Sequence, residues 1–247
     1  MKKIVFTILT FLSFAAVFAQ EDTVIHTPSL SKKQFDLSDR PGDHFVIQLT
    51  SDHWTGMPDS ISSHQNGFSR GLNIYVMTDK PFRGDSRFSV GLGIGVGSSN
   101  MIFKKMNVDV KSTSSKIPFT ASDSSNHFKK YKLSMSYLEA PVEIRYASNP
   151  GNSGKSWKIA IGVKVGTLIN LHTKGKDLQD KNNKTILSYT AKENSKRYFT
   201  GTRLMGTARV GYGIFSLFGS YQINNVLKDG FGPDMKLYQV GIMISGL

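Results

Sequence analysis

Apolar residues alternate with small or polar residues along eight stretches of this chain, and the third stretch shows the pattern most clearly. Between positions 88 and 97, apolar side chains occupy the even positions, and one serine and four glycines occupy the odd positions. Because successive side chains of a strand point to opposite faces, this strand has one apolar face and one face almost without side chains. The crowded interior of a narrow barrel accommodates glycine, so the apolar face is expected to point outward to lipid.

The same alternation predicts the whole architecture. Most of the eight stretches reach the roughly 9–11 residues that a tilted membrane-spanning strand requires. The connections after the odd-numbered strands are long and polar, whereas those after the even-numbered strands are shorter, which is typical of outer-membrane barrels. We therefore predict an all-β fold, an eight-stranded antiparallel up-and-down transmembrane β-barrel. The expected strands cover residues 44–51, 69–78, 88–97, 130–147, 157–171, 198–211, 214–221 and 236–247.

Aromatic residues and one loop add detail to this topology. Within the second long loop, residues 106–110 and 117–120 are expected to extend a hairpin above the membrane. Aromatic rings favour the membrane interface, and several of them fall at strand ends that this topology assigns to the periplasm. These residues are Phe45, Phe88, Tyr146, Trp157, Tyr212 and Phe215.

The N-terminal segment predicts secretion. Lys2 and Lys3 precede an apolar run over 4–18, and Ala19 supplies the small residue of a cleavage site. This three-part pattern is typical of a secretory signal peptide, and the run is too short for a spanning helix. We expect a signal peptide over 1–19, a flexible periplasmic lead over 20–43 and an outer-membrane β-barrel over 44–247.

Composition narrows the choice of partner. The 247 residues carry a formal net charge of +13 and include no cysteine, so disulfides and cysteine metal sites are excluded. Such a charge often indicates nucleic acid, but secretion makes nucleic acid an unexpected partner here. Anionic lipid headgroups are the better-placed partner because they surround an outer-membrane barrel. No cofactor is expected, and we expect the barrel to be a monomer.

Charged residues occupy the face of the strands that this topology turns inward. Buried charges need partners, so we expect the two carboxylates to pair with the four cations inside the barrel. One interpretation is a charged ion path; the favoured one is a polar plug, because eight strands leave an interior that side chains just fill. The expected network contains Glu139, Glu143, Arg145, Lys164, Arg203 and Arg209.

The second and third long loops are rich in lysine and poor in acids. This basic loop patch would attract anionic lipid phosphates or an acidic protein partner, although ordinary solvated loops have the same composition. The patch contains Lys104, Lys105, Lys111, Lys116, Lys174, Lys176, Lys181 and Lys184.

Three segments carry a resemblance to a known family. They are YLEAPVEIRY at 137–146, the glycine-alternating third strand and the glycine-containing last strand over 238–247. With these segments the chain resembles the small outer-membrane β-barrel family of the PorT and OmpX/OmpA-barrel type. The resemblance to PorT implies, as an alternative function, an accessory role in a protein-secretion system.

Signals for catalysis are weak. The histidines show no metal-ligand spacing, so no metal or catalytic site is assigned. Asp59, Ser62, Ser63 and His64 share the first long loop, which leaves a lipid-modifying hydrolase as an alternative. A solute pore is a further alternative. We expect a non-enzymatic barrel with a structural, adhesive or partner-binding role through its basic extracellular loops.

Overall fold

The computed structural model describes residues 45–65 and 68–246, and these residues form strands almost throughout. The predicted signal peptide (1–19) and periplasmic lead (20–43) lie outside the described residues. Two short helices, α2 (Asp59–Ser62) and the 3-10 helix η2 (Ser153–Lys155), interrupt the strands. The strands are β1 (Phe45–Thr55), β2 (Arg70–Pro81), β3 (Phe88–Phe103), β4 (Met106–Val108), β5 (Phe119–Ala121), β6 (His127–Ala147), β7 (Trp157–Gln179), β8 (Thr185–Asn194), β9 (Thr202–Tyr212), β10 (Phe215–Gln222) and β11 (Lys236–Ser245).

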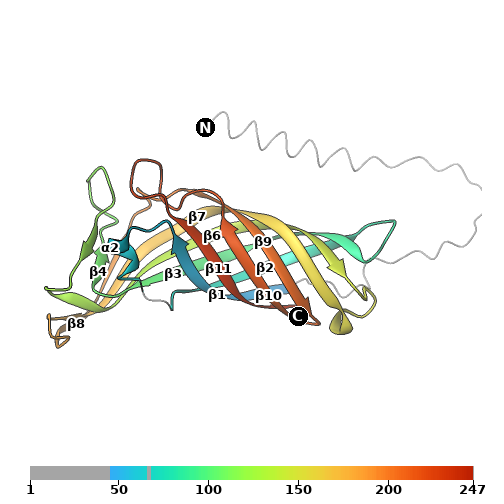
Figure 1. Cartoon of the computed structure of the whole chain (residues 1–247), viewed down its shortest axis with the longest axis horizontal. Helices are drawn as coiled ribbons and strands as arrows, with labels where there is room; N and C mark the ends of the chain where they lie inside the picture. Colours follow the sequence, from blue (N-terminus) through green and yellow to red (C-terminus); the bar gives the residue numbers. More distant parts are fainter. Residues whose placement is uncertain (1–44, 66–67, 247) are drawn as a thin grey trace, which may run out of the picture. The chain divides into compact units, whose positions relative to one another are not determined.

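Eight of these strands form a closed antiparallel ring (Figure 1). The ring runs in the order β6-β3-β2-β1-β11-β10-β9-β7, and the pairing of β6 with β7 closes it. Closure gives the ring's backbone groups partners on both sides, which a strand surrounded by hydrocarbon requires. The prediction of an eight-stranded antiparallel barrel is confirmed.

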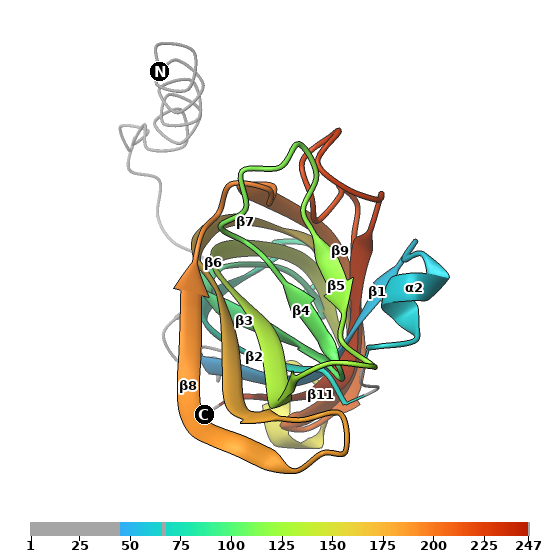
Figure 2. The ribbon, with the colours of Figure 1, turned by 90° about the vertical axis from the view of Figure 1, so that its left-hand side faces the viewer.

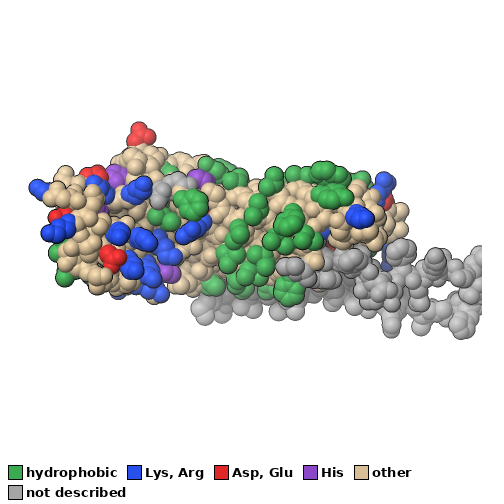
Figure 3. Space-filling view, turned by 90° about the horizontal axis from the view of Figure 1, so that it is seen from below, with side chains coloured by type: hydrophobic (Ala, Val, Ile, Leu, Met, Phe, Trp, Pro, Cys, Tyr) green, Lys and Arg blue, Asp and Glu red, His purple; other side chains and the backbone are tan. Residues whose placement is uncertain are grey.

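An apolar belt covers the outer wall of the ring (Figure 3). Leu92, Ile161 and Ile242 are 51%, 60% and 51% exposed, whereas Lys164 on the inner face of β7 is only 3% exposed. In a water-soluble protein these fractions would be reversed, because apolar side chains would fill the core. The predicted orientation of the alternation, with apolar side chains outward, is therefore what the structure has.

Paired aromatic rings border this belt at the end with the short connections. The centroids of the Phe88 and Tyr146 rings are 5.2 Å apart, and those of the Trp157 and Tyr212 rings are 5.5 Å apart. In the register of the ring, each pair lies directly opposite on adjacent strands. Such cross-strand pairs form the aromatic girdle expected at a membrane interface.

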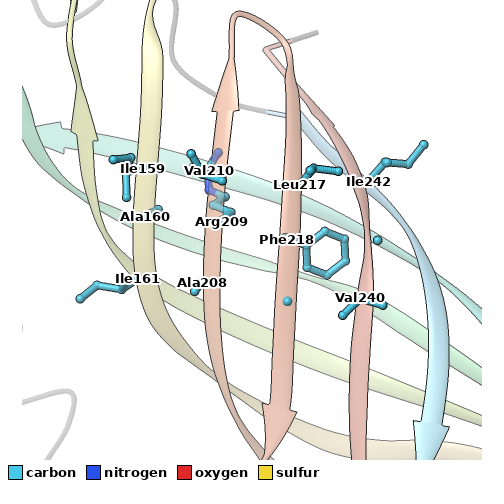
Figure 4. Close-up of a pocket in the computed structure, with 12 residues that line it drawn as sticks. Ile159, Ala160, Ile161, Ala208, Arg209, Val210, Leu217, Phe218, Val240 and Ile242 are labelled. Atoms are coloured by element: carbon cyan, nitrogen blue, oxygen red, sulfur yellow. The ribbon is translucent and has the colours of Figure 1, made fainter.

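A pocket interrupts the belt where β7, β9, β10 and β11 lie side by side (Figure 4). Ala208 and Gly219 are paired across β9 and β10, and larger apolar side chains such as Ile159, Leu217 and Ile242 surround them. The absence of bulk at these two positions hollows the outer wall. Since its lining is almost entirely apolar, the pocket suits a hydrocarbon chain.

The strands continue past the belt at the end with the long connections, which Figure 2 views directly. The third loop was predicted to be polar over 172–197, but β7 continues to Gln179, and β8 returns along it as a hairpin. β9 begins at Thr202 and not at 198. The strands extend because backbone pairing does not depend on an apolar outer face, and above the membrane that face can carry lysine.

An apolar plug fills the interior of this half of the barrel. β4 and β5 pair with each other, consistent with the hairpin expected in the second loop, and Val108 exchanges backbone hydrogen bonds with the Tyr131 hydroxyl at 2.8–2.9 Å. The plug consists of Trp54, Ile61, Met101, Phe103, Met106, Val108, Val110, Ile117, Tyr131, Leu133, Met135, Tyr137, Leu168, Leu171, Tyr198, Phe199, Met205, Val226, Leu227, Met235 and Leu237. Among the described residues, no helix has the length and apolar character needed to cross a membrane.

The glycines of β3 provide a test of this packing. A Cβ added to Gly95 would overlap the Ile74 carbonyl oxygen and the Tyr75 ring, whereas a Cβ at Gly206 would meet no atom within 4 Å. We expect Gly95→Ala to lower the free energy of unfolding by about 1–3 kcal/mol, because the backbone must shift to admit the methyl group. Urea unfolding in lipid vesicles measures this change, with Gly206→Ala as the control. Equal effects of the two substitutions would contradict the packing argument.

Candidate functional site

Two clusters of buried charges lie inside the barrel. Glu139 on β6 is the centre of the upper cluster, which is the one nearer the long connections. Its carboxylate accepts hydrogen bonds from the Arg203 guanidinium, with Nε at 3.0 Å, and from the Tyr75 hydroxyl at 2.5 Å. The Lys164 ammonium lies 3.5 Å away, and Arg203 also covers the Tyr137 ring, with Cζ 3.8 Å from the centroid. All of these side chains are buried. One carboxylate thus holds two cations, one from the adjacent strand β7 and one from β9 beyond it.

Glu143, four residues further along β6, is the centre of the lower cluster. Its carboxylate accepts hydrogen bonds from Arg145 Nε at 2.9 Å and from the Arg209 guanidinium at 3.1 Å. Arg145 also lies 3.6 Å from the Asp79 carboxylate of β2. The six residues of the expected network therefore divide into two clusters, and the structure adds Tyr75 and Asp79.

Glycines on the neighbouring strands make room for both carboxylates. Glu139 is paired with Gly95 on β3 and Gly166 on β7, and Glu143 is paired in the same way with Gly91 and Gly162. A Cβ at Gly166 or Gly162 would meet the side chain of the paired glutamate, one at Gly91 would meet the Arg145 guanidinium, and one at Gly95 would meet the Tyr75 ring. The alternating glycines of β3 thus leave space for the charge clusters, because large inward side chains in a narrow interior need small neighbours on the adjacent strands.

This interior is a poor conduit. Each carboxylate is bonded to cations, and the apolar plug lies between the clusters and the end with the long connections. An ion crossing the barrel would have to break these pairs and enter apolar surroundings, and both steps cost free energy. The geometry favours an interior that holds the barrel together over an ion path.

A second candidate site lies on the outer wall above the belt. Lys132, Lys174 and Lys192 are directly opposite one another on β6, β7 and β8, and Lys130 is opposite Lys176 in the next row. We call these five residues the lysine ladder. They continue the face that carries the belt below, since on β7 exposed lysines alternate with buried residues. None of the described ion pairs includes them.

The charges of the ladder act on one another and on their neighbours. The pKa of Lys132 is lowered by partial burial and then by the nearby charges of Lys174 and Arg70. The pKa of His172 is lowered by partial burial and then by Lys192, Lys132 and Lys174. Like charges placed directly opposite on adjacent strands repel. The ladder is therefore a region of unbalanced positive potential.

Comparison with known proteins identifies the fold family. The profile of the outer membrane protein beta-barrel domain family matches residues 43–239. The chain belongs to this family. Membership places the barrel in the outer membrane. The crystal structure of Ail, the attachment invasion locus protein of Yersinia pestis, is similar at 13% identity over 81% of this chain and 94% of that chain, with a TM-score of 0.31. The curated proteins include no match to the chain.

The lysines of the predicted basic loop patch separate into three places on the outer-membrane barrel. Lys104, Lys105, Lys111 and Lys116 lie directly before β4 or in the connection between β4 and β5, and Lys181 and Lys184 lie in the turn between β7 and β8. Lys174 and Lys176 belong to the wall of β7 and join the ladder.

The sequence interpretation did not single out the ladder lysines of β6. Lys130 and Lys132 have the same parity as Leu138, which was expected to face outward. This shared parity could have shown from the sequence that Lys130 and Lys132 face outward.

The described contacts of His64 in the first loop do not suit a catalytic base. His64 Nδ1 lies 3.1 Å from the Ser63 hydroxyl but also 3.0 Å from the Ser60 carbonyl oxygen, to which a ring nitrogen can only donate. A nitrogen that carries this proton cannot take one from serine. His64 Nε2 lies 2.9 Å from the Asp123 carboxylate, beyond β5. The geometry favours a structural role for His64, which links α2 to the segment after β5 that contains Asp123.

The buried pair of Glu139 and Arg203 should dominate the stability of the barrel. Arg203→Met removes the cation most closely bonded to a carboxylate that is only 1% exposed. We expect the free energy of unfolding to fall by about 3–5 kcal/mol, because the carboxylate loses this partner inside the barrel. The control is Arg87→Met, which breaks an exposed pair with Asp85 and should have little effect. An equally small effect of Arg203→Met in urea titrations would contradict the assignment.

The ladder also gives a spectroscopic prediction. Because Lys192 is the charge that most depresses the pKa of His172, Lys192→Gln should raise this pKa toward its usual value near 6.5. An NMR titration of the imidazole at low salt measures the shift, and His172→Gln assigns the signal. Lys181→Gln removes the same charge from the turn and should leave the pKa of His172 unchanged. If Lys192→Gln leaves the pKa of His172 unchanged, the placement of Lys192 beside His172 is contradicted.

Proposed function

We propose that this outer-membrane barrel is a non-enzymatic surface-binding protein. In this proposal the barrel anchors a sheet that projects outside the cell, and an extended segment of another protein adds to the free edge of that sheet. The barrel acts as a monomer in the membrane. The apolar plug and the paired interior charges support a binding role over conduction, and the contacts of His64 support it over hydrolysis.

The free edge of β8 is the observation that carries the proposal. β8 comes last in the order of the sheet, and within the described part of the chain it pairs only with β7. Its first seven residues, TILSYTA at 185–191, include no charge, glycine or proline. Ile186, Leu187 and Tyr189 are 48%, 56% and 44% exposed.

An edge of this kind is unusual for a protein that acts alone. Natural proteins commonly protect free edges with lysine, proline or a bulge, because unpaired backbone groups attract other strands. β8 has a lysine only toward its end, at position 192, although its pairing with β7 shifts register on both sides of Leu178. Strand addition would satisfy its backbone groups, and the exposed side chains would select the partner. The projecting edge is therefore suited to an extended protein segment.

Photo-crosslinking in intact cells tests this function. A photoreactive amino acid at position 189 should capture the partner protein. The same photoreactive amino acid at position 217, which lies in the belt and not on the edge of β8, should not capture this protein. Leu187→Lys should reduce the captured amount severalfold, because a charge on the edge opposes strand addition. Position 217 is the control site for crosslinking, because Leu217 is an exposed leucine like Leu187 but lies away from the edge of β8. Capture that is unaffected by Leu187→Lys would contradict an edge-binding role.

The captured protein also separates the adhesive role from the secretion role. A component of a secretion machine would favour the accessory function implied by the resemblance to PorT. A protein on another cell or in the surrounding matrix would favour adhesion.

A further inference from the structure

We propose that the lysine ladder binds the phosphate groups of outer-leaflet lipids whose hydrocarbon chains lie against the belt below it. The ladder would then be a lipid-headgroup site on the outer wall, separate from the edge of β8 that the proposed function uses. The inference does not depend on a protein partner.

The first support is the cost of the ladder without a ligand. Lys132, Lys174 and Lys192 lie side by side on three adjacent strands, where like charges destabilise the sheet. Arg70 adds a further positive charge from β2, and the only described hydrogen bond of the Lys132 ammonium goes to the neutral Asn100 amide oxygen at 2.8 Å. A bound polyanion would remove this repulsion. The arrangement is therefore better explained by a ligand than by the stability of the sheet alone.

The second support is the absence of acids from this face. On the described strands, the outward positions beside the ladder are occupied by Asn100, Ser134, Thr190 and Asn194. The nearby Asp177 carboxylate, which accepts a hydrogen bond from Ser188, offsets only one of the five positive charges of the ladder. Glu193 alternates with Lys192 along β8 and so points to the other face. The net potential of the wall is thus positive, which favours an anion.

The third support is the height of the ladder on the wall. Lys132 precedes Leu138, an exposed belt residue, by six positions on the same face of β6. With about 3.4 Å per residue and a strand tilt near 40°, the ladder lies roughly 15 Å beyond that residue. This level belongs to the headgroups and inner sugars of the outer leaflet. Lysine side chains directed sideways from the wall would meet headgroups there before they meet soluble anions.

The spacing of the ladder fits phosphate. Adjacent strands lie about 4.8 Å apart, so neighbouring ammonium groups can contact the same phosphate. A second row, Lys130 and Lys176, lies two residues further along and offers a second anion position. Lysine binds phosphate as a point charge and so tolerates the varied orientations of a mobile headgroup. A lipid with more than one phosphate would engage both rows.

Lipid binding by matched triple variants tests the proposal. The full chain is titrated in neutral detergent with diphosphorylated lipid A, with the same lipid lacking phosphates and with inorganic phosphate. We expect preference for the phosphorylated lipid, weakened on the order of tenfold or more by Lys132→Gln, Lys174→Gln and Lys192→Gln combined. The control combines Lys111→Gln, Lys116→Gln and Lys181→Gln, which removes the same charge from the loops and should keep the affinity.

Two results would overturn the proposal. One is full affinity of the ladder variant, and the other is binding of inorganic phosphate as tight as binding of the lipid, which would make the site one for soluble anions.

If the ladder variant fails to fold, the unmodified chain still tests the proposal. Its His172 lies among Lys132, Lys174 and Lys192, so the pKa of this histidine responds to an anion bound at the ladder. Phosphorylated lipid should raise the pKa of His172 in the NMR titration, whereas lipid without phosphates should not. No difference between the two lipids would overturn the proposal.

Discussion

The structure depends on one constraint: a strand surrounded by hydrocarbon must satisfy its backbone inside the sheet and send its polar side chains inward. Closure of the ring through β6 and β7 meets the first requirement. The clusters around Glu139 and Glu143 meet the second, since each carboxylate is hydrogen-bonded to an arginine of β9. The glycines opposite them follow from the same constraint, because a ring of eight strands has little interior room.

The two halves of the barrel solve different problems. In the belt, polar groups are paired inside and apolar groups face out. Beyond the belt, the wall meets polar surroundings, so β6, β7 and β8 can carry lysine outside while apolar side chains form the plug inside. The half with the long connections therefore has polar side chains outside and apolar side chains inside, the reverse of the belt. This division gives the protein a stable anchor and a free sheet edge in one chain.

Parity along each strand was enough to predict the ring and the inward position of Glu139 and Arg203, because alternation by two is a local property of the chain. It did not predict the ends of the strands above the membrane. β7 continues through His172 and Lys174, whose outward side chains are polar, so the apolar signal stops although the pairing does not. Tyr75 and Asp79 were likewise missed, since their contacts with Glu139 and Arg145 depend on distances across the barrel.

The sequence by itself determined the type of fold, the number of strands in the ring and which face of each strand points outward. All three follow from short-range periodicity and the lengths of the connections. Only the tertiary structure decided which charges pair, that lysines from three strands align in one row, and that β8 is left with a free edge. These features depend on register and closure. Register is set by contacts between segments far apart in the chain, and no local pattern carries that information.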